Sequence, residues 1–509
     1  MSADTLSQSL WHATGGFQPL ADLAEDVTCD VCVVGAGIAG LSVAYHLARA
    51  GKKVVVLERD GIGSGDTGAT TAHLSSGLDD YFHSLERLHG RDGVRLAYES
   101  HQAAIERIGE IVAREGIECD FRRLDGYLFL DPEADDDPGV LDEELEGAHR
   151  AGFHDVERLD SAPAPFATGP CLRYPRQGRF HPLRYLAGLT AAIERAGGRV
   201  LRGEAREVEG GDHPHVVTAS GRQVRAAAVV VATNVPITDR VAIHTKQAPY
   251  LTYAIAARLD AAVPDALWWD TGDPYHYVRL QEGARGDGAG WVIVGGEDHH
   301  SGEELGGAEA RWRRLEAWGL ERFPMRKVEH RWSGQVMEPV DGLAFIGEDP
   351  GSGDHVYVAT GDSGHGMTHG TIAGMLISDL VLGRDNPWAR LYDPRRKTLR
   401  AGAEFVRENL TVGRHVAEWV TGVEGQVKSV EEIAPGSGAV LRRGLGLVAA
   451  YRDEDGTLHE RSARCTHLGC VVHWNDDAKS WDCPCHGSRF APTGEPTHGP
   501  ANAPLGPAD

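Results

Sequence analysis

The chain has few cationic residues, no long apolar run and little cysteine. Its 51 Lys and Arg residues face 75 Asp and Glu residues, a net charge of −24 over 509 residues, which argues against nucleic acid or an anionic membrane as a partner. No run approaches the roughly 18 apolar residues that a transmembrane helix needs. Residues 1–20 lack the basic start and apolar core of a secretory signal. We therefore expect no membrane span and a cytoplasmic protein.

Cysteine is scarce and unevenly placed. Four of the eight cysteines lie in the last fifty residues, and the others (Cys29, Cys32, Cys119 and Cys171) show no disulfide-framework spacing, which favours a reducing compartment. Cys29 and Cys32 have the spacing of a redox motif. They fall in a predicted buried strand, however, so packed core thiols are the preferred interpretation. The length predicts about three domains, and no internal repeats are evident.

What the C-terminal region does contain is a ligand pattern. Cys465-Thr-His467 is followed, after fifteen residues, by Cys483-Pro-Cys-His486. This is the ligand set of a Rieske [2Fe–2S] centre, in which two thiolates hold one iron and two imidazoles the other. The predicted metal ligands are therefore Cys465, His467, Cys483 and His486, and Cys470 and Cys485 are placed to link the two loops by a disulfide. The alternative is a structural zinc site.

A second motif lies near the N-terminus. An apolar run at 28–34 leads into Gly35-Ala-Gly37-Ile-Ala-Gly40, a helical stretch, a second apolar run at 54–57, and Glu58, eighteen residues after the third glycine. In this strand–turn–helix context the glycines permit a tight turn, a close approach to a pyrophosphate and close helix packing, while the acid accepts a hydrogen bond from a ribose hydroxyl. The region is predicted to bind a dinucleotide, and a glycine turn without a nucleotide is the alternative.

Three further segments favour a flavin over a nicotinamide. Gly63–Ser76 is a Gly/Ser/Thr-rich loop that offers small hydrogen-bond donors to a bulky planar cofactor, and 226–234 is a buried strand that ends in polar residues. His355–Gly370 is a strand followed by a glycine-rich turn at the start of a helix expected over Thr371–Leu382. Backbone N–H groups and a helix dipole there suit a reduced, anionic flavin ring.

Together these residues make the chain recognisable. About the first 385 residues resemble the D-amino-acid-oxidase/glycine-oxidase superfamily of FAD-dependent oxidoreductases, on the glycine fingerprint, the Gly63–Ser76 loop, Trp332-Ser-Gly334, Asp341–Gly347 and the Gly361–Gly370 turn. About the last 85 residues resemble Rieske domains of the cytochrome bc type. The fold class implied is α/β: a Rossmann-like FAD-binding domain with an antiparallel-sheet, glycine-oxidase-like substrate domain, plus a small all-β Rieske domain.

The resemblance implies a set of FAD-contacting residues and a set of cluster neighbours. The residues expected to contact FAD are Gly35, Gly37, Ile38, Ala39, Gly40, Glu58, Arg59, Ser64, Thr70, Thr71, His73, Leu74, Thr233, Gly361, Gly364, His365, Gly366, Met367 and Thr368. In the Rieske part, Ser488 matches a serine that hydrogen-bonds a bridging sulfide, but Phe490 replaces the bc-type tyrosine. One fewer hydrogen bond to the cluster predicts a potential below the bc-type end of the Rieske range.

One family feature is missing and another is present in part. Many amino-acid oxidases clamp the substrate carboxylate with an arginine at the position of Val336, which puts an α-amino-acid substrate in doubt. Arg279 or Arg331 could replace that arginine, although a structural or exposed arginine is the preferred interpretation of each. Thr70-Thr-Ala-His73 resembles a segment in which relatives bond histidine covalently to the flavin. The alternative is a histidine that only lines the flavin.

The substrate site is expected on the predicted roof strands. The catalytic candidates are His365, Tyr250, Tyr277 and Trp332, and Tyr275 and His276 are further candidates on the roof strands. By the two-residue period of a strand, Tyr275 and Tyr277 share one face and His276 takes the other. His299 and His300, in a predicted loop, could bind a metal, but a solvated loop is preferred.

The expected domains follow from these motifs. We expect an N-terminal arm at 1–27, an FAD-binding domain at 28–80, 151–245 and 331–385, a substrate domain at 81–150 and 246–330, a helical connector at 386–423 and the Rieske domain at 424–509. Helices are predicted over Arg95–Glu115, Pro182–Gly197 and Glu303–Phe323, and an acidic loop over Asp131–Glu146.

The predicted function is oxidation of an amine or amino-acid-like small molecule by FAD. The cofactors are FAD and a Rieske [2Fe–2S] cluster, which passes electrons to an external protein or quinone that docks where the cluster histidines meet solvent. Alternatives are an NAD(P)H-driven reductase running in the opposite direction and a non-catalytic electron-transfer or redox-sensing protein. No second nucleotide fingerprint and no convincing two-His, one-carboxylate helix of an iron oxygenase are evident.

Overall fold

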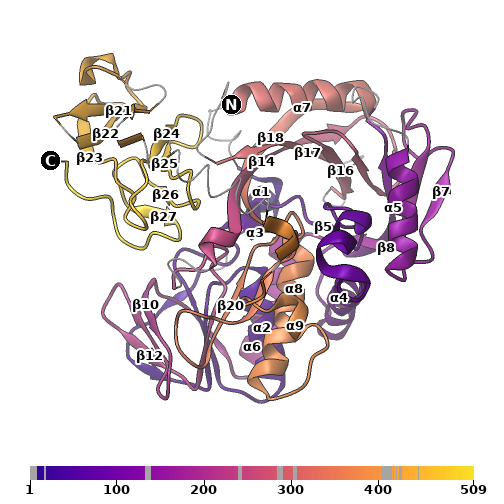
Figure 1. The fold of residues 1–509 in the computed structure, drawn as a ribbon, viewed down its shortest axis with the longest axis horizontal. Coiled ribbons are helices and arrows are strands. Elements are labelled where there is room, and N and C mark those ends of the chain that lie inside the picture. The colour runs from indigo at the N-terminus through magenta and orange to yellow at the C-terminus, as the bar shows by residue number, and fades with distance from the viewer. Residues whose placement is uncertain are drawn as a thin grey trace.

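A computed structural model describes residues 8–16, 19–131, 139–238, 243–283, 290–301, 307–397, 399–402, 415, 418–419, 421–423, 427–444 and 446–508. In it a roof sheet lies over a dinucleotide-fold layer, and a small C-terminal β domain lies beside the roof (Figure 1). No helix among these residues is long and apolar enough to cross a membrane. Part of the predicted connector (398, 403–414, 416–417 and 420) lies outside the described residues.

The first sheet is a twisted, mostly parallel layer. Its strand order is β1 (Ala21–Asp22), β9 (Arg199–Arg202), β4 (Val54–Glu58), β3 (Val31–Val34), β13 (Ala228–Val231), β20 (Val356–Thr360) and β19 (Phe345–Glu348). All neighbours pair in parallel except β19 with β20. The central strands are apolar on both faces because both are covered. Parallel strands with crossover helices place their carboxyl ends at one edge, where ligands bind in such folds.

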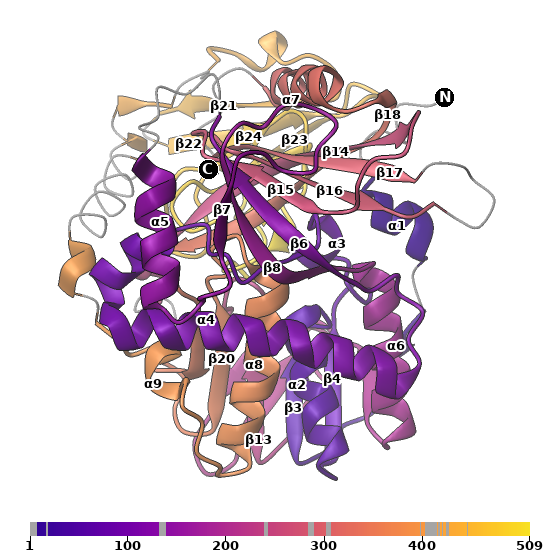
Figure 2. The same cartoon turned by 90° about the vertical axis from the view of Figure 1, so that its right-hand side faces the viewer.

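Helices cover one face of this layer and a small sheet covers the other. The helices α2 (Ile38–Arg49), α6 (Pro182–Arg195) and α8 (Gly366–Val381) pack on one side, and α4 (Phe82–Glu115) runs across them below the roof (Figure 2). The other face meets β10 (Ala205–Glu209), β11 (His215–Thr218), β12 (Gln223–Arg225) and β2 (Val27–Thr28). Cys29 and Cys32 are buried in that second core, and burial raises the pKa of Cys29 to about 12. They pack as core thiols.

The roof is a long, mostly antiparallel sheet over the carboxyl ends of the first sheet. It comprises β18 (Met325–Pro339), β14 (Gln247–Leu259), β17 (Trp291–His300), β16 (His276–Gln281), β15 (Leu267–Asp270), β6 (Arg122–Phe129), β8 (Cys171–Arg179) and β5 (His73–Leu74), with β7 (Glu157–Leu159) on β8. Among these strands only β15 and β6 pair in parallel. β18 pairs with β14 along its length. The chain expected to re-enter the first layer from 331 therefore stays in the roof to Pro339.

Several local expectations need correction. The predicted acidic loop contains a helix from Gly139, α5 (Gly139–Arg150), and residues 132–138 lie outside the described set. α7 (Ala308–Arg322) lies on the roof's outer face, and α8 begins at Gly366. His299 and His300 end β17 and do not lie in a loop; His299 stacks on Tyr253. Short helices α1 (Leu10–Gly15), α3 (Asp66–Ala69) and α9 (Ala389–Tyr392) complete this part.

The C-terminal domain is two small antiparallel sheets. One is β21 (Ser437–Arg443), β22 (Gly446–Arg452) and β23 (Leu458–Ser462); the other is β24 (His473–Asn475), β25 (Ser480–Asp482), β26 (Arg489–Phe490) and β27 (Pro496–His498). Its core clusters the four C-terminal cysteines with Trp481 and Phe490. Figure 1 shows this domain (yellow) beside the β14 and β18 end of the roof.

Candidate functional site

A cavity of about 830 Å³ occupies the space between the first sheet and the roof. Its lining residues come from almost the whole length of the chain, from Val34 to Pro504. Among the residues predicted to contact FAD, those that line it are Gly35, Gly37, Ile38, Ala39, Glu58, Arg59, Ser64, Thr70, Thr71, His73, Thr233, Gly364, His365, Gly366 and Met367. The glycine turn, the Gly/Ser/Thr-rich loop and the turn before α8, which are far apart in sequence, therefore line one cavity.

The remaining predicted FAD residues lie behind the wall. Gly40 packs beneath the turn, where a Cβ would come within 2.0 Å of the Gly35 carbonyl oxygen. Leu74 is buried in the core, and Thr368 faces away, its hydroxyl 2.8 Å from the Nδ1 of His101. Gly361 lies against Pro339. These residues support the site without lining it.

The glycine turn has the geometry that a dinucleotide needs. Gly35 has a φ of 104°, a conformation that favours glycine, and Gly37 is the N-cap of α2. The helix N-terminus therefore opens on the cavity, where backbone N–H groups and the helix dipole favour a pyrophosphate. Glu58 lines the same space and accepts a hydrogen bond from the Ala36 N–H at 2.7 Å, which fixes its carboxylate beside the turn.

The Gly/Ser/Thr loop is held from three directions. Thr67 accepts a hydrogen bond from the Ile38 N–H at 3.1 Å, and Asp66 accepts one from the Gln335 N–H at 2.9 Å. The N-terminal segment, predicted to be an arm, is folded here: Trp11 is buried and donates to the Thr70 carbonyl at 2.6 Å. Sequence patterns missed this contact because a single short helix has no periodicity to read.

Two of the aromatic candidates on the roof strands line the cavity. Tyr275 and Tyr277 line it, and His276 lies on the opposite face, hydrogen-bonded to Asp270 and stacked on Trp318. The alternation predicted for this strand is thus seen. Tyr277 lies over Gly295 of β17, where a Cβ would come within 2.2 Å of its ring, so a glycine there makes room for the tyrosine.

Tyr250 and Trp332 lie outside the cavity lining. Tyr250 contacts the ring of His300 at a centroid distance of 5.3 Å. Trp332 is buried and donates its indole N–H to the Ala69 carbonyl at 2.8 Å, which anchors α3 to the roof. Both placements favour structural roles over contact with substrate.

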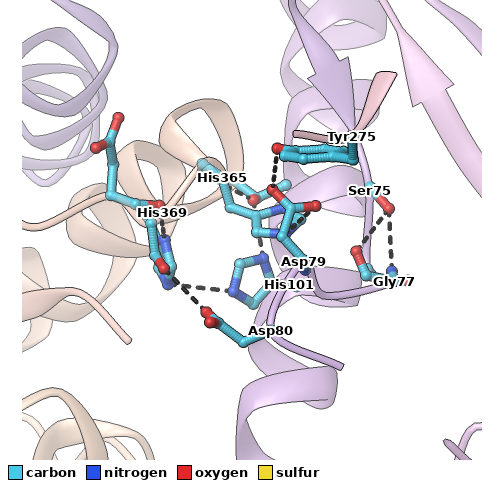
Figure 3. Close-up of polar contacts among 12 residues, drawn as sticks. Ser75, Gly77, Asp79, Asp80, His101, Tyr275, His365 and His369 are labelled. Carbon is cyan, nitrogen blue, oxygen red and sulfur yellow. Dashed lines mark hydrogen bonds and ion pairs between the residues drawn. The ribbon is translucent and has the colours of Figure 1, made fainter. Parts of the chain in front are cut away.

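His365 forms a polar cluster with Asp79 and Tyr275 on the wall of the cavity (Figure 3). Its Nε2 atom lies 3.3 Å from an Asp79 carboxylate oxygen and 3.0 Å from the Asp79 backbone nitrogen, and the Tyr275 hydroxyl donates to Asp79 at 3.1 Å. Burial opposes ionisation of Asp79, but the His365 charge and these hydrogen bonds lower its pKa below the usual value. The pKa of His365 is raised in turn: burial opposes it and Asp79 outweighs the burial.

More carboxylates lie near this end of the cavity. Burial raises the pKa of Asp298 to about 7, against a hydrogen bond from Thr252, and raises that of Asp362 to about 6. Ser363 lies 2.9 Å from a Glu338 oxygen and 3.0 Å from an Asp80 oxygen. Burial, followed by repulsion from a neighbouring carboxylate (Asp79 for Asp80, Asp80 for Glu338), raises the pKa of Asp80 and of Glu338. Sequence reasoning overlooked these acids; acidic residues that end apolar strands were the available signal.

Neither arginine considered as a carboxylate clamp reaches the cavity. Arg279 is buried and donates to the Ala72 and Phe180 carbonyls, and Arg331 pairs with Glu309 and Glu316. Val336 lines the cavity at the family's arginine position. The arginines among the described lining residues are Arg59 and Arg206, which lie beside Glu58 and the C-terminal segment. The acid-rich end thus holds no matching guanidinium.

His73 lines the cavity with both ring nitrogens in polar contacts. Its Nδ1 lies 3.1 Å from the Thr71 hydroxyl and its Nε2 lies 3.2 Å from the Val278 carbonyl. Burial lowers the pKa of the imidazole to about 3, so the ring is neutral. Covalent attachment to the flavin stays a prediction, and precipitating the protein in acid tests it: a yellow pellet indicates a covalent bond.

The predicted cluster ligands converge in the C-terminal domain. Cys465 and Cys483 are buried and outside any disulfide, and the rings of His467 and His486 lie 5.0 Å apart. Within the described residues the buried Nδ1 of His486 has no hydrogen-bond partner, as expected of a nitrogen that ligates iron. Cys470 and Cys485 form a disulfide between the two loops. The donor set therefore fits a Rieske cluster.

The cluster loops pack against the chain that leads into roof strand β14, which corrects an expectation. His486 is only 3% exposed, and the ring of His244, from the short 3-10 helix η2 (His244–Lys246) before β14, lies 4.8 Å from His467 and 5.9 Å from His486. The solvent-facing arrangement predicted for the two histidines is wrong for His486. Ligand spacing carries no information on how two domains dock.

Gln335 connects the cavity wall to the cluster loop. It lies on β18, lines the cavity and donates its side-chain N–H to the Gly487 carbonyl at 3.2 Å. A Cβ on Gly487 would come within 2.2 Å of the Gln335 amide nitrogen, so the loop and the strand are in close contact. Gln335 therefore joins the wall of the cavity directly to the residue that follows His486.

Comparison with known proteins agrees with this geometry. Bacillus subtilis (strain 168) has a protein named as a Rieske 2Fe-2S iron-sulfur protein, YhfW, that is 30% identical over 505 residues, 98% of this chain and 97% of that protein. The gamma-glutamylputrescine oxidoreductase of Escherichia coli (strain K12) is 31% identical over 385 residues, 72% of this chain and 87% of that protein. The glycine oxidase of Geobacillus kaustophilus has a similar fold: TM-score 0.57, 19% identity, 73% of this chain and 99% of that one.

Two family descriptions match the chain. The Rieske [2Fe-2S] domain matches residues 424–507, which contain the four converging ligands. The FAD dependent oxidoreductase family, DAO, matches residues 30–380, which contain the glycine turn and most of the cavity. The chain therefore belongs to the DAO family of FAD-dependent oxidoreductases and carries a C-terminal Rieske domain, with FAD and a [2Fe–2S] cluster as its cofactors.

Proposed function

We propose that this protein is an amine dehydrogenase that passes electrons through its Rieske domain to an external acceptor. When bound, FAD supplies two-electron oxidation of a C–N bond, and the cluster carries single electrons. The observation that carries the proposal is the Gln335 contact, which joins the wall of the FAD cavity to the loop of a cluster ligand. An enzyme that passed its electrons directly from FAD to oxygen would not need a contact between the FAD cavity and a cluster loop.

The charge of the cavity supports an amine as the substrate. Asp79, Asp298 and Glu338 line it, and Val336 stands where an arginine would hold a substrate carboxylate. Buried carboxylates stabilise a cation and repel a carboxylate. The E. coli relative, named for gamma-glutamylputrescine, is likewise named for an amine.

The roof tyrosines position that substrate. Tyr275 donates to Asp79, and the Tyr277 hydroxyl is hydrogen-bonded to Thr252, so both rings are held in place over the cavity. Held rings and excluded water favour a direct approach of a neutral amine to the reacting group. The raised pKa of Asp298 allows it to accept a proton from an ammonium near neutral pH.

The acceptor is proposed to dock near His467. This histidine is half-buried, and its neighbour Leu468 is one of the exposed large apolar side chains, at 44%. An exposed apolar residue beside a redox ligand suits a transient protein or quinone contact.

An anaerobic titration tests the function and its direction. Purified holoprotein is mixed with a panel of amines, amino acids and NAD(P)H while the flavin and cluster absorption bands are followed separately. We expect an amine to bleach the flavin band before the cluster band. Bleaching by NAD(P)H alone would support a reductase, and no bleaching by any donor would support a redox sensor.

A further inference from the structure

A segment of the Rieske domain forms part of the wall of the FAD cavity. Most residues of the segment 495–504 line it, among them His498, Gly499 and Asn502. On the facing side the cavity is lined by Glu58, Arg59 and residues 203–206. This is the end that the glycine fingerprint assigns to the ribose of the dinucleotide.

Hydrogen bonds fasten this segment to two arginines outside the Rieske domain, Arg59 and Arg206. Arg59, which follows β4, donates to the Pro496 and Thr497 carbonyls. Asn502 donates its side-chain N–H to the Arg206 carbonyl at 2.9 Å, and the Arg206 guanidinium donates to the Asn502 carbonyl. Two arginines on the rim of the cavity therefore hold the Rieske segment over it.

The same segment is tied to both cluster loops. The Ala501 N–H donates to the Ser488 hydroxyl at 3.1 Å, and the Thr466 hydroxyl donates to the Ala503 carbonyl at 2.7 Å. Thr466 lies between the ligands Cys465 and His467, and Ser488 follows the ligand His486 by two residues. A wall anchored on both sides is preorganised, which lowers the entropy cost of ordering it around a ligand.

We infer that residues 495–504 of the Rieske domain bind FAD, at the ribose end of the dinucleotide, so that the FAD site is completed only when the two domains are docked. His498 supplies a side chain at the cavity surface, and Asn502 holds the segment in place. Because binding linkage is reciprocal, FAD in turn stabilises the docked position of the domain.

Titration of the full chain with FAD tests the inference. Flavin-free, cluster-loaded protein from a riboflavin-limited host is titrated with FAD, and quenching of FAD fluorescence reports binding. We expect His498→Ala and Asn502→Ala each to weaken FAD binding by about fivefold or more, the effect of about one lost hydrogen bond. The Rieske electron paramagnetic resonance signal should be unchanged in both.

His459→Ala is the matched control. His459 lies on β23 of the Rieske domain, is half-buried, lies 3.0 Å from an Asp453 oxygen, and does not line the cavity. Its replacement should leave FAD affinity within about twofold of the wild type, as expected for a surface substitution.

Hydrogen exchange of the unaltered protein gives a second readout that needs no variant. Peptides covering 495–504 should become more protected when FAD is added, and peptides in β21 and β22 should not. FAD affinities within twofold of wild type in both variants, or unchanged protection of 495–504 on adding FAD, would overturn the inference. If a variant fails to keep its cluster, the exchange result decides alone.

Discussion

The Rieske loops and the FAD cavity are built in opposite ways. The cluster ligands come from two short loops fifteen residues apart, joined to each other by the Cys470–Cys485 disulfide. The cavity is lined by residues between 34 and 504, which come from the first sheet, the roof sheet and the Rieske domain. A site made of neighbours in sequence depends on a few residues absolutely. A site assembled from many distant segments distributes its binding energy over many residues, so each single substitution should weaken ligand binding only in part.

Loss of a cluster ligand should give the largest effect. Cys483→Ser removes one thiolate from the two that hold one iron, so the protein should lose its iron and its Rieske spectrum entirely and keep its FAD. Cys171→Ser, a buried free cysteine in β8, is the control and should keep both cofactors. Metal analysis and visible spectra provide the measurement; zinc in the unaltered protein would contradict the assignment.

Breaking the loop disulfide should be the next largest effect. Cys470→Ser opens a loop with a sequence separation of 15, for which the chain-entropy contribution is about 3 kcal/mol. The urea midpoint for loss of the cluster band should fall, while the midpoint for release of FAD should move far less. Equal shifts of the two midpoints would mean that the domains unfold as one unit.

Replacing a cavity acid should produce a smaller, pH-dependent change. The pKa of Asp298 is raised to about 7 by burial, and only the ionised carboxylate pairs with an ammonium. The KM for an amine should therefore fall as the pH rises from 6 to 8. In Asp298→Asn the KM should be about tenfold higher at pH 8, the effect of a lost charged hydrogen bond, and its fall with pH should disappear.

Asp92→Asn is the control for this charge change. Asp92 is on α4 and its side chain is 97% exposed, so both the KM and its pH profile should match the unaltered protein. A KM that falls equally with pH in Asp298→Asn would assign the titration to another group and remove Asp298 from the substrate end.

Loosening the contact between the two regions should give the smallest effect. Gln335→Ala removes the hydrogen bond to the Gly487 carbonyl but leaves the Gln335 backbone bond to Asp66. Cluster reduction should slow by about fivefold, the effect of one lost hydrogen bond on docking, while flavin reduction by the amine keeps its rate. Stopped-flow absorbance at the two bands separates these steps. Gln223→Ala, in β12, should change neither.

The sequence by itself determined the local chemistry. Ligand types and spacing specified the cluster, and the strand–glycine–helix pattern specified the dinucleotide turn, because each depends on a few neighbouring residues whose geometry the backbone sets. The period of two likewise assigned Tyr275 and Tyr277 to one face and His276 to the other, which the roof strand shows.

Only the tertiary structure decided what those pieces face. It brought Asp79, Asp298 and Glu338 to one end of the cavity, turned Trp332 and Tyr250 away from it, and set His244 against the cluster histidines. It also placed residues of the segment 495–504 in the wall of the cavity that Glu58 and Arg59 line. These contacts join segments hundreds of residues apart, and they are set by packing of whole layers, which no local pattern of residues encodes.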